Sequence, residues 1–315
     1  MKIDLPAGKY VVAVSGGVDS VALLHMLAQN MHTERRVKSS EGTPPSAVRR
    51  APFAFVVAHF DHGIREDSAK DRQLVAALAK KYGLPFVYHT GRMGAGTSEA
   101  AARKARYEFL HQVRKASGAD AILTAHHQDD VLETAILNML RGTGRRGLSS
   151  LKSTDIIKRP LLHVPKTALK QYAVDNHLEW REDSTNGDEA YLRNYVRRRI
   201  VPRFQASDRQ RLLDIISTAH HTNAAIEQQL DEYLEVYASK RELNRHYFVQ
   251  LPHAVAREVL ARWLQINTDV ELTTKLLERL VAAAKTGKIG SKADVNAGFW
   301  LTISGETLAL RPRER

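Results

Sequence analysis

The chain has 315 residues, 43% of them hydrophobic and 26% charged, a composition that excludes collagen-like, low-complexity and wholly disordered proteins. It has no cysteine, which excludes disulfides, thiolate metal sites and sulfur transfer through a persulfide. The 47 Lys and Arg residues against 35 Asp and Glu residues leave a formal net charge of +12, which favours a polyanionic partner such as nucleic acid, although lipid-surface binders and ordinary enzymes are also sometimes basic.

Short apolar segments alternate with helix-like segments over the first 140 residues. We expect strands over 10–14, 53–58, 85–89 and 121–125, and helices from Asp19 onward and over 68–82, 98–115 and 128–140. This alternation is typical of an α/β fold, a parallel sheet with helices on both faces. The polar, basic segment 31–52, with Pro44 and Pro45, is expected to be a loop without a core of its own.

The pattern changes after Trp180. Residues 191–284 are charged and helix-like, whereas 288–310 has the short alternating segments and glycines of a small β-meander. A boundary near Val201 and Pro202 predicts a catalytic domain over 1–202 and a smaller, mainly helical domain over 203–315. No stretch approaches the roughly 20 apolar residues of a membrane span and no secretory leader is recognisable, so we expect a cytoplasmic location.

The loop after the first expected strand has the residues of a phosphate site. It reads Ser15, Gly16, Gly17, Val18, Asp19, Ser20, and the next helix begins there. Helix N-termini at the carboxyl ends of parallel strands bind anions, and glycines let the backbone approach them closely. A Walker A loop would carry a Lys where Asp19 stands, so the aspartate implies a bridging Mg²⁺ and a bound pyrophosphate group. A simple turn with Asp19 as helix cap is the alternative.

A second polar cluster follows the fourth expected strand. His126 and His127 precede Asp129 and Asp130, and Glu133 shares a helix face with the two aspartates. In a parallel sheet this cluster lies at the same edge as the first loop. The acids would equally suit a helix N-terminus through the helix dipole. A zinc site is disfavoured because the adjacent histidines point apart and no thiolate is available.

Two more features contain arginines. Arg106 lies in the apolar stripe of its expected helix, where a charge is costly unless it meets an anion such as phosphate or reaches the rim. Residues 142–147 (GTGRRG) match a dinucleotide-binding pattern, but they follow a helix instead of a strand, so we reject that interpretation. This basic glycine-rich loop is better suited to touch RNA, to close over a substrate, or simply to end its helix.

Seven blocks in chain order resemble the N-type ATP pyrophosphatases, or PP-loop proteins, and among them the tRNA(Ile)-lysidine synthase family. The blocks are 15–20 (SGGVDS), 61–65 (DHGIR), 102–110 (ARKARYEFL), 125–130 (AHHQDD) with Glu133 and Thr134, 141–144 (RGTG) with Gly147 and Leu148, 159–162 (RPLL), and 182–183 (ED) with Asn186, Tyr191, Arg193, Asn194 and Arg197. The resemblance covers about residues 10–203.

The resemblance implies a Rossmann-like catalytic domain, similar to the adenine nucleotide alpha hydrolases, that performs a two-step reaction. ATP adenylates O2 of the wobble cytidine, position 34, in the CAU-anticodon tRNA(Ile), and pyrophosphate leaves. The amine of free L-lysine then attacks C2 and expels AMP, which converts decoding from AUG to AUA. The ligands would be ATP, Mg²⁺, L-lysine and the tRNA, the second domain would bind tRNA, and a homodimer would be unsurprising.

The same resemblance assigns roles to individual residues. The catalytic group would be Asp19, Arg106, His126 and Asp130, with Asp19 and Asp130 also holding the metal. ATP would contact Ser15, Gly16, Gly17, Val18, Asp19, Ser20, Ala58, Asp61 and His62, although a plain turn equally explains Asp61 and His62. The tRNA would contact Arg145, Arg146, Arg193, Arg197 and Arg198, although a solvated helix face explains such arginines almost as well.

Three other functions fit parts of the pattern. A tRNA thiolase of the same superfamily is excluded, because sulfur relay needs a thiolate and the chain has no cysteine. An amidating ligase such as an NAD or GMP synthetase would need an ammonia source, and the RGTG block and the basic residues count against it. A non-catalytic ATP-binding module would leave the acids near His126 without a purpose.

Overall fold

The computed structural model describes residues 1, 3–40, 53–63, 68–91, 93–94, 97–182 and 192–313, with the backbone alone for 32–40 and 99. The chain forms two compact units, Met1–Ser217 and Thr218–Arg315. This division lies inside helix α8 (Ala206–Tyr237), a little beyond the boundary expected near residue 202. The assignment of tRNA binding to residues 203–315 stays a prediction.

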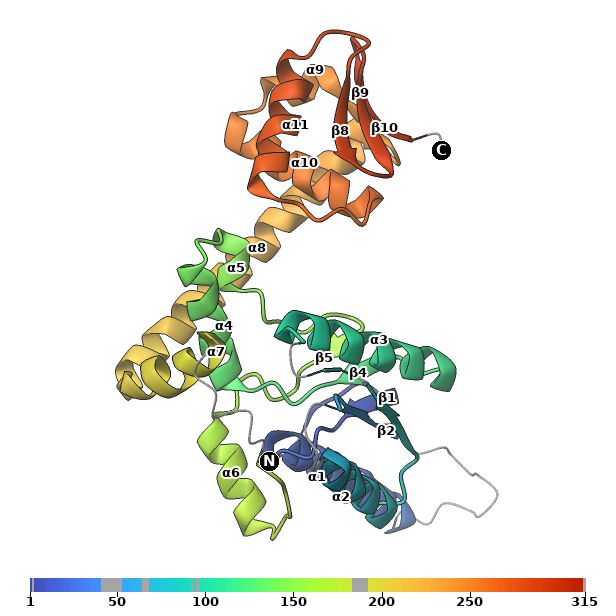
Figure 1. Cartoon of the computed structure of the whole chain (residues 1–315), viewed down its shortest axis with the longest axis vertical. Coiled ribbons are helices and arrows are strands. Elements are labelled where there is room, and N and C mark those ends of the chain that lie inside the picture. Colours follow the sequence, from blue (N-terminus) through green and yellow to red (C-terminus); the bar gives the residue numbers. More distant parts are fainter. Residues whose placement is uncertain are drawn as a thin grey trace. The chain divides into compact units, whose positions relative to one another are not determined.

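The first unit is built on a five-stranded parallel sheet with strand order β3-β2-β1-β4-β5 (Figure 1). Its strands are β1 Gly8–Ala13, β2 Phe53–Asp61, β3 Phe86–Thr90, β4 Ala121–Leu123 and β5 Ile157–Lys158. The α/β prediction is therefore confirmed. The central strands β1, β2 and β4 are almost wholly apolar, as strands covered on both faces must be.

Helices connect and cover these strands. They are α1 Val18–Ser40, α2 Ser68–Lys81, α3 Glu99–Ser117, α4 Gln128–Leu140, α5 Arg145–Leu148, α6 Lys166–Asp175, α7 Leu192–Tyr195, a π-helical turn η2 Val196–Ile200 and a 3₁₀ turn η3 Val201–Arg203. The expectation of a loop from residue 31 is wrong as far as Ser40, because 31–40 contains neither Gly nor Pro and α1 continues through it. The rest of that segment, 41–52, lies outside the described residues.

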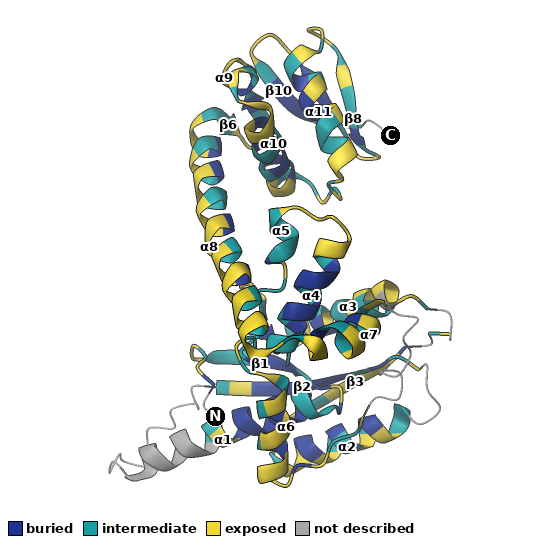
Figure 2. Ribbon diagram, turned by 90° about the vertical axis from the view of Figure 1, so that its left-hand side faces the viewer, coloured by how far each residue is buried: buried dark blue, intermediate teal, exposed yellow. Residues whose placement is uncertain are grey.

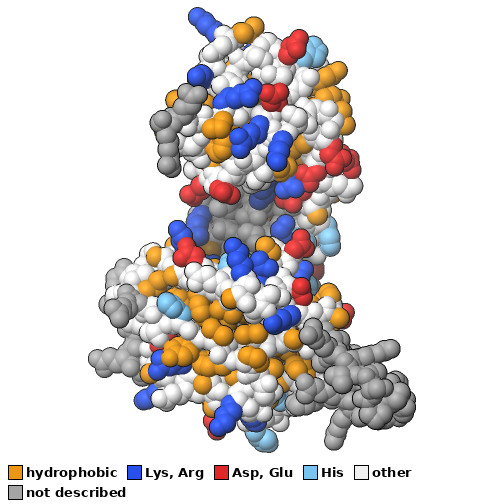
Figure 3. All heavy atoms as spheres, turned by 90° about the vertical axis from the view of Figure 1, so that its right-hand side faces the viewer, with side chains coloured by type: hydrophobic (Ala, Val, Ile, Leu, Met, Phe, Trp, Pro, Cys, Tyr) orange, Lys and Arg blue, Asp and Glu red, His pale blue; other side chains and the backbone are white. Residues whose placement is uncertain are grey.

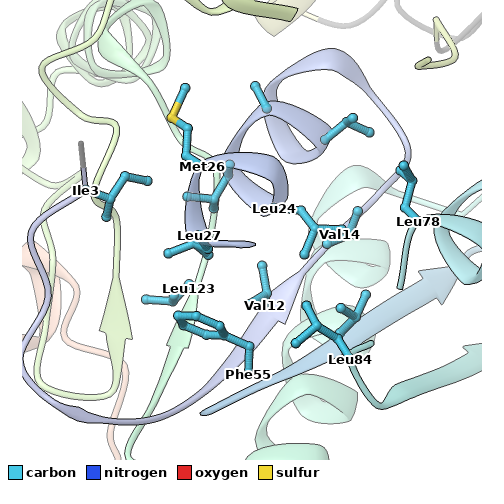
Figure 4. Packing of buried hydrophobic residues seen from close by; sticks show 14 of the residues in the cluster. Ile3, Val12, Val14, Leu24, Met26, Leu27, Phe55, Leu78, Leu84 and Leu123 are labelled. Carbon is cyan, nitrogen blue, oxygen red and sulfur yellow. The ribbon is translucent and has the colours of Figure 1, made fainter. Parts of the chain in front are cut away.

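Alternation along β1 divides the core between the two faces of the sheet. Val12 faces α1, α2 and α6, and Figure 4 shows it beside Phe55, with Leu24 and Leu27 of α1 packed over them. Val11 faces the opposite side, where α3 covers the sheet. Figure 2 shows buried residues in dark blue on the central strands and along α1 and α2. Both faces are thus closed, and the carboxyl edge of the strands remains for a site.

The second unit combines helices with an antiparallel sheet of order β6-β7-β10-β9-β8. After the end of α8 come β6 Ala238–Ser239, β7 Glu242–Asn244, α9 Arg245–Gln250, α10 His253–Asn267, α11 Thr274–Thr286, β8 Lys292–Asn296, β9 Phe299–Ile303 and β10 Thr307–Pro312. The expected C-terminal meander is confirmed. The expectation of helix alone up to residue 284 is wrong at β6 and β7, which pair with each other and, through β7, with the meander.

In the second unit Arg262 of α10 donates two hydrogen bonds to Asp231 of α8, at 2.6 and 2.7 Å. Nowhere in the described parts of the chain is there a helix with the length and apolar character needed to span a membrane.

Candidate active site

The loop between β1 and α1 is folded around the hydroxyl of Ser20. This hydroxyl donates to the Gly17 carbonyl at 2.9 Å and accepts from the backbone N–H groups of Ser15 at 3.2 Å and Gly16 at 3.3 Å. Gly16 has a φ of +99°, a conformation that few residues other than glycine adopt. Ser20 is buried and Ser15 is exposed, so Ser20 shapes the loop from inside while Ser15 faces outward.

Asp19 and Asp130 approach the same imidazole nitrogen. His127 Nε2 lies 3.5 Å from Asp19 Oδ2 and 3.4 Å from Asp130 Oδ2, so the two carboxylates are neighbours. His127 is also the N-cap of α4: its Nδ1 accepts from the Asp130 N–H, and its own N–H donates to Asp130 Oδ2 at 3.0 Å. In this neutral tautomer Nε2 carries the proton between the carboxylates. The convergence expected from a parallel sheet is therefore present.

Charge around His127 sets its protonation. Burial disfavours the imidazolium, but the carboxylates of Asp130 and Asp19 outweigh burial and raise the pKa of His127. Lys166, at the start of α6, places its Nζ 3.7 Å from Asp19 Oδ2. Asp19 therefore has two nitrogen neighbours on one oxygen.

The other oxygen of Asp19 is the atom that fits a metal. Asp19 Oδ1 is buried and has no hydrogen-bond partner among the residues that the structure describes, which is costly for a carboxylate unless a ligand completes it. Among the described residues there is no cluster of three or more His, Cys, Asp and Glu side chains arranged to hold a metal. Mg²⁺ commonly takes one or two protein carboxylates and fills its remaining positions with phosphate oxygens and water, so Asp19 and its neighbour Asp130 fit Mg²⁺ bound together with a nucleotide.

Two arginines neutralise the acidic face of α4. Arg197 donates to both oxygens of Glu133, at 2.7 and 2.9 Å, and Arg193 donates to Glu133 at 3.2 Å. Both guanidinium groups also reach Asp130 Oδ1, at 3.4 Å for Arg193 and 3.5 Å for Arg197. Glu133 is 1% exposed, and these partners offset the free-energy cost of burying its charge. Arg193 and Arg197, two of the five arginines expected to contact RNA, therefore point toward carboxylates.

Asp130 remains ionised in this setting. Burial raises the pKa of its carboxyl group, but His127, through its ring and its backbone N–H, and Arg193 outweigh burial and lower it below the usual value.

His126 is buried near several arginines. Its Nδ1 is 2.8 Å from the Thr124 hydroxyl. Burial, together with Arg159, Arg106 and Arg103, lowers the pKa of His126 to about 3, although Asp130 acts in the opposite sense. The ring is therefore neutral at physiological pH, which suits hydrogen bonding and not storage of a positive charge.

Arg106, on α3, is one of the arginines that act on His126. Burial lowers the pKa of its guanidinium, and the positive charges of Arg103 and Arg193 add to this effect. The Arg106 guanidinium carbon lies 5.4 Å from the centre of the Tyr107 ring and that of Arg103 lies 5.0 Å from it. Several cations gathered at one place favour a bound anion.

The three residues expected to line the nucleotide pocket have mainly backbone or turn contacts. The Ala58 carbonyl accepts from Val14 N–H at 2.9 Å. The Asp61 carboxylate accepts from Gly63 N–H at 2.8 Å and from the hydroxyl of Ser68, the first residue of α2, at 3.1 Å. His62 packs edge-on against Phe60, with ring centres 4.9 Å apart. The assignment of Asp61 and His62 to the nucleotide stays a prediction.

The glycine-rich loop after α4 is a fixed structure. Asn138 donates to the Gly147 carbonyl at 2.7 Å and to the Ser150 hydroxyl at 2.9 Å, and a Cβ on Gly147 would lie 1.9 Å from the Thr143 hydroxyl oxygen. Glycine is therefore required at 147. The loop presents half-buried Arg145 and Arg146 on α5, and Arg198 is exposed on η2.

The positive charge is not evenly distributed between the units. Residues 218–315 contain 13 Lys and Arg against 12 Asp and Glu, so residues 1–217 hold the other 34 cationic and 23 anionic residues and nearly all of the +12 surplus. On the face drawn in Figure 3, blue and red side chains intermingle on the second unit.

Sequence reasoning missed several contributors to this edge of the sheet. Lys166 reaches Asp19, Thr124 orients His126, and Arg181 donates its backbone N–H to the Gly16 carbonyl at 3.0 Å. None lies in a recognisable motif. Only the tertiary fold brings them to residues that the motifs identified.

Comparisons with known proteins agree on a family. Residues 2–204 match the PP-loop domain family. A tRNA(Ile)-lysidine synthase from Thermus thermophilus is 34% identical over 98% of this chain and 57% of its own length, and one from Solibacter usitatus is 31% identical over 94% of this chain and 67% of its own. The chain thus spans between about half and two thirds of these curated relatives. Among solved structures, a U34-tRNA thiolase from Methanococcus maripaludis superposes with a TM-score of 0.43 at 16% identity, covering 86% of this chain and 74% of that one.

Proposed function

Because the chain belongs to the PP-loop family, and within it to the tRNA(Ile)-lysidine synthases, we propose that it ligates L-lysine to the wobble cytidine of the CAU-anticodon tRNA(Ile) at the expense of ATP. The observation that carries the proposal is the meeting of Asp19, behind the glycine loop, with Asp130 at one nitrogen of His127. Carboxylates next to a loop proposed to bind phosphates support adenylyl transfer, because they can hold a metal ion there.

The proposed reaction has two balanced steps. O2 of the cytidine attacks the α-phosphorus of ATP, and the bond to the β-phosphate oxygen breaks to release pyrophosphate. The lysine amine then attacks C2, loses a proton, and expels AMP with the former O2. Adenylation makes the leaving group far better than a carbonyl oxygen, which is why the first step must precede the second.

The phosphate end of ATP is proposed to bind the loop from Ser15 to Ser20, through its backbone N–H groups and the exposed Ser15 hydroxyl. Asp19, through its unpartnered Oδ1, and Asp130 would hold Mg²⁺. When bound, this ion would offset the negative charge of the departing pyrophosphate. The rest of the nucleotide is proposed to lie near Ala58, Asp61 and His62, by the family resemblance.

Arg106 and His126 are proposed to act on the adenylyl group and the base. The buried guanidinium of Arg106 supplies positive charge for phosphate oxygens. His126, neutral and held by Thr124, can donate or accept one hydrogen bond to the substrate. A positioning role fits these contacts better than general acid catalysis, because a histidine with a pKa of about 3 carries almost no extra proton near pH 7.

Recognition of the tRNA is proposed to rest mainly on the first unit, because residues 218–315 are close to charge balance. Arg145, Arg146 and Arg198 are its candidate phosphate contacts. The second unit, by the family resemblance, is proposed to contact tRNA through less charged surfaces. The relatives from Thermus thermophilus and Solibacter usitatus are longer than this chain, and the proposal concerns only the residues of this chain. A cytoplasmic site of action and a homodimer belong to the same proposal.

The decisive experiment combines the purified chain with ATP, Mg²⁺, labelled L-lysine and CAU-anticodon tRNA(Ile). We expect AMP, pyrophosphate and labelled tRNA, each dependent on the RNA, with release of AMP and labelling of the tRNA also dependent on lysine. An NAD or GMP synthetase-like ligase would instead form AMP without RNA, and a non-catalytic module would bind ATP without releasing pyrophosphate. Release of ADP, or pyrophosphate formation indifferent to the tRNA, would contradict the proposal.

A further inference from the structure

The two glycines of the ATP loop are enclosed by residues from elsewhere in the chain. A Cβ on Gly16 would lie 3.5 Å from the Asp71 Cβ, and a Cβ on Gly17 would lie 4.0 Å from the Arg181 carbonyl oxygen. Asp71 belongs to the first turn of α2, whereas Arg181 follows α6 in the sequence. Neither residue lies in a block that suggested the family.

Arg181 binds both Asp71 and the loop. Its backbone N–H donates to the Gly16 carbonyl at 3.0 Å, and its guanidinium Nε donates to Asp71 Oδ1 at 2.5 Å. The Asp71 side chain is 8% exposed and that of Arg181 is 31% exposed. The ion pair is therefore partly shielded from solvent, where charges interact more strongly than in water.

The ion pair with Arg181 compensates the negative charge of Asp71 next to the loop. The Cα and Cβ atoms of Asp71 lie against Gly16, so its buried carboxylate adds negative charge close to the loop proposed to receive phosphates, and like charges repel. The Arg181 guanidinium compensates that charge.

We propose that Arg181 is a positioning residue for ATP, which cancels the charge of Asp71 behind the loop and holds the Gly16 carbonyl through its own backbone. The inference rests on the proposed function only in taking ATP as the ligand of this loop. It assigns Arg181 no contact with the reacting atoms. The side chain acts through Asp71, so removal of the Asp71 charge makes the arginine side chain dispensable.

The test is a rescue experiment on the full chain with four variants. Equilibrium binding of ATP·Mg²⁺, the KM for ATP and kcat for pyrophosphate release are measured for wild type, Arg181→Ala, Asp71→Asn and the double variant. We expect Arg181→Ala to weaken ATP binding and raise KM about tenfold or more with kcat changed by less than about threefold. Asp71→Asn and the double variant should bind ATP within about threefold of wild type.

Arg262→Ala is the matched control, because it removes the arginine of a similar ion pair, between Arg262 and Asp231, in the second unit. It should leave ATP binding unchanged. Should Arg181→Ala fail to fold, Arg181→Lys, which keeps the charge, and the double variant carry the test, and both should bind ATP nearly as wild type does.

Two results would overturn the inference: unchanged ATP affinity in Arg181→Ala, or a double variant that binds ATP as weakly as Arg181→Ala alone. A lower melting temperature in all variants with unchanged ATP affinity would reduce Arg181 to a structural residue. Failure of the wild type to bind ATP would remove the proposed function itself, and this inference with it.

Discussion

Asp19, at the start of α1, and Asp130, in the first turn of α4, face each other across the ring nitrogen of His127. The two helices follow the neighbouring strands β1 and β4, which run parallel. Side chains that begin two such helices meet at the sheet edge, and here both are carboxylates. This pair is the geometric basis of the proposed chemistry, so it is the first target for substitution.

Asp19→Asn should reduce pyrophosphate release at least about a hundredfold while the melting temperature stays close to that of wild type, because the amide keeps the size but loses the charge that a metal ion needs. Steady-state assays with ATP and tRNA, together with thermal unfolding, measure both. Asp155→Asn is the control, since Asp155 is a fully exposed aspartate whose Lys158 neighbour is 3.8 Å away. Near-normal turnover in Asp19→Asn would exclude the metal role.

Glu133→Gln should destabilise the first unit by about 3 kcal/mol, because it leaves Arg193 and Arg197 without the carboxylate that balances them in a buried site. Urea unfolding followed by circular dichroism would measure the change. Glu108→Gln, which removes an exposed carboxylate 3.9 Å from Lys104, should change stability by less than about 0.5 kcal/mol. Equal losses in the two variants would contradict the burial argument.

Substituting Arg145, Arg146 and Arg198 together with alanine should weaken tRNA binding and lower the slope of log K against log salt by roughly 0.7 to 0.9 for each phosphate contact removed. Binding measured over a salt series, with ATP affinity as an internal check, gives the slope. Arg311→Ala provides a control in the second unit, where Arg311 pairs with Glu242 at 2.9 Å on the surface. An unchanged slope in the triple variant would place the RNA elsewhere.

The Asp231 and Arg262 pair should make the second unit sensitive to acid. The hydrogen bonds from Arg262 lower the pKa of Asp231 in the folded state below its unfolded value of about 3.9. A depressed carboxyl pKa stabilises the fold above the unfolded pKa, and that contribution disappears as pH falls through the folded pKa. Because Asp231 is 40% exposed, Asp231→Asn should cost only about 1 kcal/mol at pH 7. Unfolding curves of the two proteins should converge at the acid end, and a constant difference at all pH values would disprove the linkage.

The central sheet could be predicted because its strands are uninterrupted apolar runs. Residues 53–58 and 121–123 have no other plausible state, and the helix at 128–140 was placed with its observed bounds. Strand β5 has only two residues, and the β6 and β7 hairpin turns at Lys240 and Arg241 without the glycine or asparagine that marks such turns. These elements form through tertiary pairing, and local patterns do not record it.

The candidate site was partly predictable for the same reason. The glycine loop and the acids near His126 lie at ends of neighbouring parallel strands, so their meeting followed from topology. The inward direction of Arg197 did not, because its sequence neighbours Arg198 and Arg199 are exposed and a one-dimensional pattern does not separate them. The π-helical turn that contains all three decides which one faces Glu133.

The imidazole ring of His127 both caps helix α4 and contacts the two carboxylates of the candidate site. One ring nitrogen accepts a hydrogen bond from the Asp130 N–H in the first turn of α4, and the other lies between the carboxylates of Asp19 and Asp130. A substitution at this position would therefore remove both the side-chain cap of α4 and the nitrogen that lies between Asp19 and Asp130. Variation at 127 should accordingly be the least tolerated in the cluster.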